Sequence, residues 1–564
     1  MSGITRKTFI NTNTCFVIQG KMYYWILKRK YPLLLVGISL FGVVSHFYFG
    51  LGIDLYDPAY YFKHAWEIAN GTFEINGSVF WNRFGMLVPL SLLIKLFGIS
   101  YWAALLWPLL CYLLLLFGIY RLLYSYSAPA AFFCAALVGL SYTFIWFNAL
   151  IMPDTIMTGF AFLAMLLLWK MNHKPANEAR NGLLFSLLLF AAFVTKLTII
   201  FLLPFILFVW FQNFRDKKLT RFWIWAAGPG VLILLLYHLG YQIFADDFLL
   251  RYSGIENDHN VSEWSYYTAS TQEIIERITY APILLLFSDL TFSLPLLLAV
   301  PSLRLRVRQF HRLEVFFTIL LFILMVLYWW GSSSFKSYNP IPINYRMWLL
   351  LIIPLNVLAA LTLFRFGQWQ AQKKQLVLWL SAGLAFVVAA LVSGYDSILL
   401  LTIVCGCIAA THLPVFQPYR QYLPAIVILL PAIYMAFQYW QHPRSERVYF
   451  FEKEFYNEIK TEDNVLILTD HTYNVHEIYF DFKTPKNVHI DSWFNLETLD
   501  LNKYNEFYIL FSNYRHTRFS RQFPGYDIPR WLHLLMQEQK GEQKGEKVTI
   551  YKIDRETLQH YRNI

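Results

Sequence analysis

Charged residues are scarce in this sequence. Asp, Glu, Lys and Arg make up 15% of its 564 residues and 57% are hydrophobic, whereas about a quarter of an average soluble domain is charged. This shortage of charge argues against a soluble globular protein and indicates a chain that crosses a membrane several times. The apolar runs also lack the alternation of transmembrane β-strands, which excludes a closed barrel and favours helices.

Cysteine is scarce as well. The five cysteines are an odd number, and they do not form the paired clusters of a zinc site: Cys15, Cys111, Cys134, Cys405 and Cys407. The sequence therefore implies neither a disulfide framework nor zinc fingers. His259, His471 and His476 also lack the spacing of metal ligands, so we expect surface histidines and no metal site.

The basic residues lie in an N-terminal segment and in short loops between apolar runs. A formal net charge of +11 is compatible with nucleic-acid binding, but loops such as 215–221, 304–312 and 365–374 are better explained by membrane topology. We therefore expect no nucleic-acid partner. The same rule places these loops and the N-terminus in the cytoplasm, and the loops 51–83 and 246–280 outside.

Several apolar runs are long enough to cross a membrane. Residues 31–50 and 222–245 each approach the roughly 20 residues that a spanning helix needs, and the first run is interpreted as an uncleaved helix. The alternation of sides requires that 84–98 does not cross, and that 182–211 forms two short crossings with Lys196 at the outer turn. On this basis we predict about 13 transmembrane helices and an external C-terminus.

The composition changes near residue 443. Short strand-like runs at 464–469, 506–511 and 547–553 alternate with polar and helical pieces, which favours a small α/β domain. The predicted fold class is therefore an all-α polytopic membrane protein with a small C-terminal extramembrane α/β domain. Residues 1–442 form the membrane domain and residues 443–564 form the external soluble domain.

This topology gathers ionisable residues at the outer face. Such groups are costly at membrane depth and usually face a cavity or a partner; here they are Asp54, Asp57, Arg83, Asp154, Lys196, Arg251, Lys336 and Arg346. Asp57 begins an amphipathic segment and is followed by Pro58, so it is either a site residue or only a helix cap. Asp154, which follows Pro153, has the same two interpretations, whereas Asp54 alone reads as a solvated loop residue.

The cations of this group have their own alternatives. Lys196 stands between two apolar stretches, where snorkelling or pairing with a site partner would explain it. Arg346 is either an interface anchor or a phosphate ligand, because arginine forks suit phosphate oxygens. Lys336 lies in the same external loop as Arg346. Arg83 has the same two interpretations as Arg346, an interface anchor or a phosphate ligand.

The order of these features resembles a known family. The stretches that carry the resemblance are 56–71, 82–100, 152–168, 195–208 and 344–361. Together they resemble polyprenyl-phosphate-dependent glycosyltransferases of the GT-C fold, in particular the dolichyl-phosphate-mannose protein mannosyltransferase-like group. That group includes bacterial enzymes that add aminoarabinose to lipid A.

One position departs from the family pattern. The family has Asp-Glu in the first external loop, whereas here Asp57 matches the Asp and Pro58 stands in place of the Glu. A role that requires both acids lacks its second acid at position 58, and Asp54 is a candidate substitute.

The resemblance implies a membrane transferase that moves a hexosyl or pentosyl group from a polyprenyl-phosphate donor to an acceptor hydroxyl or phosphate of a lipid, glycan or protein. Asp57, Asp154 and Asp54 would be catalytic. The lipid phosphate would be bound by Lys196, Arg346, Arg83 and Lys336, so no cofactor is required, although a divalent cation is compatible with the site. The expected location is a bacterial plasma membrane with the site outside. The alternatives are a lipid-linked sugar flippase or other transporter, and an oligosaccharide ligase.

Overall fold

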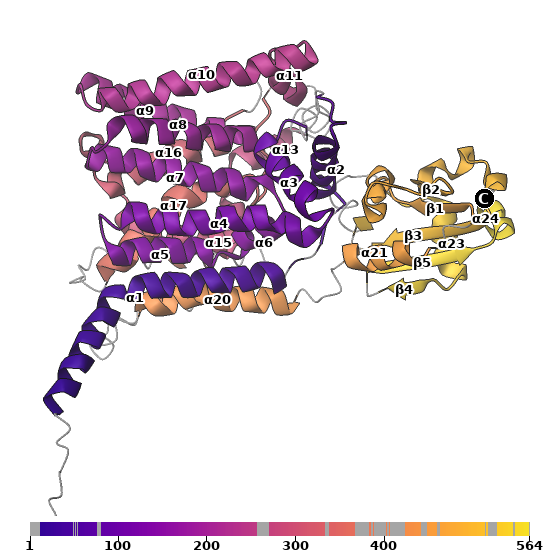
Figure 1. The fold of residues 1–564 in the computed structure, drawn as a ribbon, viewed down its shortest axis with the longest axis horizontal. Coiled ribbons are helices and arrows are strands. Elements are labelled where there is room, and N and C mark those ends of the chain that lie inside the picture. The colour runs from indigo at the N-terminus through magenta and orange to yellow at the C-terminus, as the bar shows by residue number, and fades with distance from the viewer. Residues whose placement is uncertain are drawn as a thin grey trace, which may run out of the picture.

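The fold is described from a computed structural model of the chain. It covers residues 12–366, apart from 49, 51, 54, 76–80, 257–269 and 333–337, and residues 423–562, apart from 442–447, 460–462, 514, 517–526 and 545–546, with a few isolated positions between 367 and 422. A helical bundle and a smaller sheet-containing domain lie side by side (Figure 1).

The bundle consists of apolar helices that pack along one another (Figure 1). They are α1 (Thr12–Tyr48), α4 (Tyr101–Leu123), α5 (Ala128–Gly139), α6 (Tyr142–Ala149), α7 (Pro153–His173), α8 (Glu178–Thr195), α9 (Leu203–Arg215), α10 (Thr220–Ala245), α14 (Ala281–Ser288), α15 (Leu290–Ala299), α16 (Leu313–Trp330), α17 (Ile352–Phe366) and α20 (Leu423–Gln441). Ser100, Ser127 and Ser141 accept hydrogen bonds from the first turns of α4, α5 and α6, so each of these helices begins at a side-chain cap.

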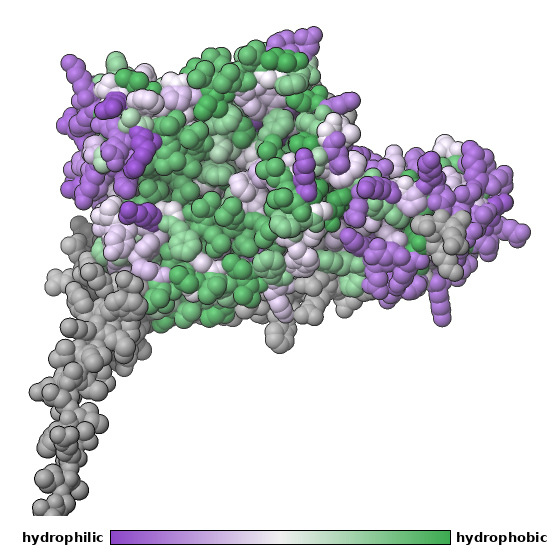
Figure 2. All heavy atoms as spheres, viewed as in Figure 1, coloured by the Kyte–Doolittle hydropathy of each residue, from purple (hydrophilic) through white to green (hydrophobic). Residues whose placement is uncertain are grey.

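Within the described residues, seven helices are long and apolar enough to cross a membrane, and nine crossings result if two bent pairs each count as one span. The pairs are α5 with α6, bent by 54°, and α14 with α15, bent by 97°. The predicted total of about 13 crossings stays a prediction. Figure 2 shows the apolar surface of the bundle, with hydrophilic surface at the end away from the C-terminal domain and on that domain itself.

The structure describes the two segments on which the predicted topology depends, residues 84–98 and residues 182–211. Residues 84–98 contain α3 (Phe84–Phe97), a helix of 14 residues. At 1.5 Å per residue this is about 21 Å, too short for a hydrocarbon core of about 30 Å. Residues 182–211 are divided at Lys196: α8 ends at Thr195, and the 3₁₀ helix η1 (Leu197–Leu202) leads into α9.

Short helices outside the bundle lie at the end of it that is nearer the sheet domain (Figure 1). They are α2 (Asp57–Asn70), α11 (Leu250–Glu256) and α13 (Thr271–Ile278), in addition to α3. Buried side chains of α2 and α3 pack together with residues of the C-terminal domain in one hydrophobic cluster. The two parts of the chain therefore share a core at this end.

The C-terminal domain is a five-stranded sheet with strand order β2-β1-β3-β5-β4. Its strands are β1 (Val465–Thr469), β2 (Val488–Ser492), β3 (Glu506–Ser512), β4 (Glu542–Lys544) and β5 (Val548–Ile553). β1 pairs in parallel with β2 and β3, and β5 is antiparallel to β3 and β4.

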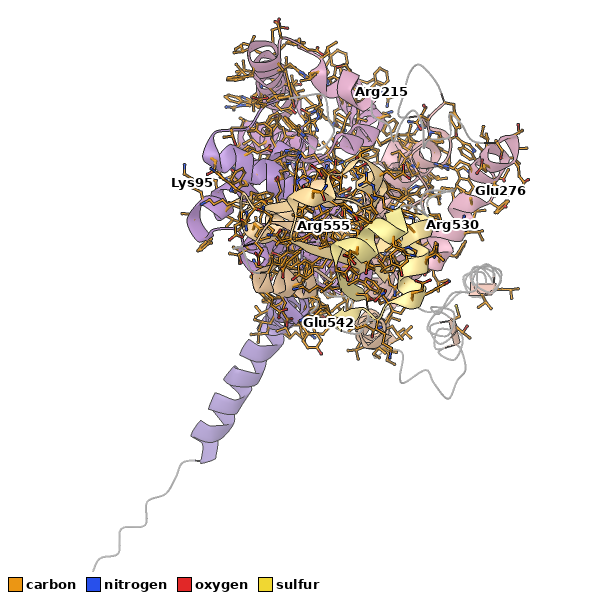
Figure 3. The ribbon with its side chains drawn as sticks, turned by 90° about the vertical axis from the view of Figure 1, so that its right-hand side faces the viewer. Lys95, Arg215, Glu276, Arg530, Glu542 and Arg555 are labelled. Atoms are coloured by element: carbon orange, nitrogen blue, oxygen red, sulfur yellow. The ribbon has the colours of Figure 1, made fainter. Side chains whose placement is uncertain are left out.

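Helices α21 (Val448–Glu458), α23 (Arg530–Glu538) and α24 (Arg555–Arg562) and the 3₁₀ helix η7 (Tyr473–Phe480) complete the domain. Figure 3 looks onto the domain, with Arg530, Glu542 and Arg555 in front of the bundle. This arrangement of strands and helices confirms the predicted α/β fold of the C-terminal domain.

One expectation about histidines is wrong. His476 was expected at the surface, but it is completely buried, and its Nδ1 lies 2.7 Å from the Tyr456 hydroxyl. His471 is exposed as expected, and His259 lies outside the described residues. The sequence around His476 is polar, so only the tertiary contacts with α21 reveal its burial.

Candidate active site

The first acidic residue of the site begins α2. Asp57 and Pro58 are the first two residues of this helix, and the N-cap position is held by Tyr56, not by Asp57. Its carboxylate instead accepts a hydrogen bond of 2.7 Å from Arg346 Nη1. The interpretation of Asp57 as only a helix cap is therefore wrong, and its side chain, 23% exposed, remains accessible.

The second acidic residue begins α7. Asp154 follows Pro153 in the first turn, the N-cap position is held by Met152, and the Asp154 side chain is almost fully buried. Lys196, at the break between α8 and η1, donates a hydrogen bond to Asp154 Oδ1. Asp154 is thus held in an ion pair that the two apolar helices bury, and the alternative role as a simple cap is wrong as well.

Arg346 connects the two carboxylates. It lies just before the 3₁₀ helix η4 (Leu349–Leu351), which leads into α17. Besides its bond to Asp57, its Nε lies 3.7 Å from Asp154 Oδ2. The backbone NH of Arg346 donates to Asn344 Oδ1 at 2.9 Å, which fixes the start of this segment.

Arg83 adds a third cation from the residue before α3. Its guanidinium lies 5.2 Å from the ring centroid of Tyr61 in α2, and it interacts electrostatically with both Asp57 and Asp154. Three cations therefore surround two carboxylates in the cluster of Asp57, Arg83, Asp154, Lys196 and Arg346, which leaves one surplus positive charge.

Of the three remaining predicted residues, the structure describes only Arg251. Asp54 and Lys336 lie outside the described residues. Arg251 is buried, but its guanidinium donates to the Tyr237 hydroxyl and to the Phe193 carbonyl. Arg251 therefore links its own segment to α8 and α10.

Tyr328 is a site neighbour that sequence reasoning missed. It lies in the last turn of α16, is fully buried, and interacts electrostatically with Asp154. Its hydroxyl, Asp154 Oδ2 and Arg346 Nε make no hydrogen bond within the described structure. Buried polar atoms normally have partners, so these three atoms of the cluster have unused hydrogen-bonding capacity.

The charge state of Asp57 follows from its surroundings. Burial raises the pKa of its carboxyl group, but Arg346, Arg83 and Lys196 lower that pKa by more, so it lies below its ordinary value. Asp57 is therefore an ionised carboxylate at neutral pH and can accept a proton or a hydrogen bond. Among the described residues, no group of three or more His, Cys, Asp or Glu side chains could hold a metal ion.

The helical bundle, the membrane-end charge cluster and the C-terminal α/β domain define a membrane protein of the GT-C fold. This confirms, for the fold, the resemblance that the sequence indicates. Residues 88–241 match the model of the dolichyl-phosphate-mannose-protein mannosyltransferase family.

Two solved structures share the fold over nearly the whole chain. The crystal structure of ArnT from Cupriavidus metallidurans bound to undecaprenyl phosphate matches with a TM-score of 0.55 and 14% identity, covering 93% of this chain and 98% of that one. The apo structure of the same protein matches with a TM-score of 0.52 and 15% identity, with the same coverage of both chains. Comparison with curated protein sequences gives no match.

Proposed function

We propose that this chain is an integral membrane glycosyltransferase that moves a sugar from a polyprenyl-phosphate donor to an acceptor hydroxyl or phosphate at the outer face of the membrane. The observation that carries the proposal is the cluster of two carboxylates and three cations at one end of an apolar bundle. Ionisable groups among membrane-spanning helices are functional candidates. The match of residues 88–241 to the mannosyltransferase family supports the reaction class.

The transfer needs two kinds of group. The bond between the sugar and the phosphate breaks, so the leaving phosphate carries negative charge that cations can stabilise. Lys196, Arg346 and Arg83 fill this role. The two carboxylates balance only two of these three positive charges, so one positive charge is left to attract the phosphate. Asp154 holds Lys196 and Arg346 in place through the ion pairs that it makes with them.

Asp57 is the group that activates the acceptor. A new bond forms between the acceptor oxygen and the sugar, and the proton of an acceptor hydroxyl passes to a base. Asp57 is ionised and more exposed than Asp154, so it serves as this base or positions the acceptor. Asp54 and Lys336 stay predictions as a further acid and a further phosphate ligand.

The donor carrier follows from the chemistry of the site and from a relative. ArnT from Cupriavidus metallidurans is a protein of this fold bound to undecaprenyl phosphate, and we extend a carrier of that chemistry, a long prenyl chain with one phosphate, to this chain. The transferred group is a hexose or pentose, and the acceptor is a lipid, glycan or protein. The site faces outward from a bacterial plasma membrane, with the N-terminus in the cytoplasm.

The experiment that tests the function uses purified protein in proteoliposomes that contain a radiolabelled polyprenyl-phosphate sugar and a crude acceptor fraction. Wild-type protein is expected to move label from the lipid to the acceptor, and Lys196→Ala is expected to abolish this. Intact donor that becomes accessible on the opposite leaflet would identify the flippase alternative instead. Transfer that persists with EDTA would support phosphate binding by protein cations alone, whereas loss of transfer would indicate a divalent ion.

A further inference from the structure

The C-terminal domain contacts the segment that carries Asp57 from two sides. The first contact is between η7 and the outer surface of α2. Tyr60 in α2 donates a hydrogen bond of 3.4 Å to Asn474, and the Lys63 ammonium lies 3.9 Å from the Glu477 carboxylate. η7 and its following turn therefore cover one flank of the helix that begins at Asp57.

Aromatic side chains strengthen this first contact. The rings of Trp66 in α2 and Phe482, which lies two residues after η7, have centroids 5.2 Å apart. Phe62 and Ala65 of α2 and Val475 and Ile478 of η7 belong to the same buried cluster. The contact thus combines a continuous apolar core with a polar rim, which is the usual composition of a stable interface.

The second contact is on the loop before α2. Gly52 has a backbone φ of +91°, and a Cβ atom there would lie 2.5 Å from Tyr449 Cδ1. Tyr449 comes from α21, the first helix of the C-terminal domain, and it stacks on Tyr479 of η7 with centroids 5.4 Å apart. The close approach leaves no room for a side chain at Gly52, and Asp57 lies between the two contacts in the sequence.

A buried charge cluster holds η7 and α21 together inside the domain. Arg515 donates to Asp470 at 2.6 Å and to Glu452 at 2.9 Å. Tyr479 of η7 donates to the same Glu452 carboxylate, which belongs to α21. These side chains are all almost fully buried, and hydrogen bonds between charged groups are stronger than those between neutral groups. The two surfaces that touch Gly52 and α2 are therefore joined to each other through one buried charge cluster.

We propose that the C-terminal domain is a positioning element of the active site, and that Trp66, Phe482 and Tyr449 are positioning residues for Asp57. The kinetic consequences of this inference rest on the proposed function. The mechanical coupling between the C-terminal domain and α2 does not depend on that function. A base must be held within a fraction of an ångström of its working geometry, because small misplacements cost large factors in rate. Asp57 is the first residue of α2, whose N-cap residue, Tyr56, makes no side-chain cap bond, so the position of Asp57 relative to Arg346 depends on how α2 is held.

The test compares three variants of the full-length protein and one control variant with the wild type. Phe482→Ala and Trp66→Ala each remove one side of the ring contact, and the double variant removes both. Phe494→Ala is the matched control, because Phe494 is an exposed aromatic residue of the same domain outside the cluster that joins η7 to α2. Two measurements follow: amide hydrogen exchange of residues 57–70, and steady-state transfer kinetics.

The expected result is faster exchange in α2 for Phe482→Ala and Trp66→Ala, with no further gain in the double variant, and no change for Phe494→Ala. In the transfer assay, kcat falls roughly tenfold or more while KM for the donor changes less than about twofold, because placement of the base is lost and donor binding is kept. Unchanged exchange in α2 for Phe482→Ala, or an equal loss of kcat for Phe494→Ala, would overturn the proposal. If the wild type transfers no sugar, the proposed function fails, and the exchange measurement alone decides the coupling.

Discussion

The ion pair of Asp154 and Lys196 makes a prediction about stability that can be separated from activity. Removing one partner of a buried pair leaves an uncompensated charge and costs about 3–5 kcal/mol. Lys196→Met leaves Asp154 with Arg346 3.7 Å away, so we expect the lower end of that range. Asp154→Asn leaves the Lys196 ammonium with Met347 Sδ at 3.1 Å, a weak acceptor, so we expect the upper end.

The double variant Asp154→Asn/Lys196→Met removes both charges together. Replacing a whole buried pair is often neutral, so the double variant is expected to be more stable than either single variant while remaining inactive in sugar transfer. The free energy of unfolding is measured by denaturant titration in mixed micelles, with folding checked by gel filtration. A double variant whose loss equals the sum of the two single losses would show that the two side chains do not interact, and would refute this reasoning.

Three further predictions concern separate parts of the chain. Arg346→Lys keeps the charge but loses the fork that reaches both carboxylates, so we expect at least about a tenfold fall in kcat/KM; wild-type kinetics would contradict this. Gly52→Ala forces a side chain into the left-handed region against Tyr449, and thermal melting is expected to fall, whereas an unchanged Tm would show that the loop can move away.

Burial lowers the pKa of His476 to about 3, whereas an unfolded histidine titrates near 6.5. The unfolded chain therefore binds a proton that the folded domain does not, and stability should fall as the pH drops from about 6.5 towards 3. A melting series in that window should flatten for His476→Gln and keep its slope for the exposed control His489→Gln; equal slopes in both variants would contradict the assignment.

The features that the sequence predicts correctly are those that composition and periodicity determine. The apolar runs specify spanning helices, the short run at 84–98 specifies a helix that is too short to cross, and the strand-like runs after residue 443 specify the sheet. The lysine at position 196 interrupts an apolar stretch, and the structure divides the chain at that residue. Each of these signals is local, so it needs no knowledge of distant contacts.

The features that the sequence leaves open depend on partners far away in the chain. Asp57 precedes a proline and Asp154 follows one, as residues at helix starts often do. The pairing of Asp57 depends on Arg346, which lies 289 residues later in the chain. Tyr328 carries no local signal, because it ends an ordinary apolar helix. His476 looks like a surface histidine until α21 and the segment after β3 pack around it.

The measurement that tests the central claim most directly is a single-turnover reaction of purified protein with a labelled polyprenyl-phosphate sugar and its acceptor, comparing wild type with Asp57→Asn. The account predicts that the wild type releases polyprenyl phosphate in step with glycosylated acceptor. Asp57→Asn should still bind the donor but react slower by a factor of about 10²–10⁴, the usual contribution of a general base. A folded Asp57→Asn protein that turns over donor at the wild-type rate would contradict the role of Asp57, and intact donor with the wild-type protein would contradict the transferase itself.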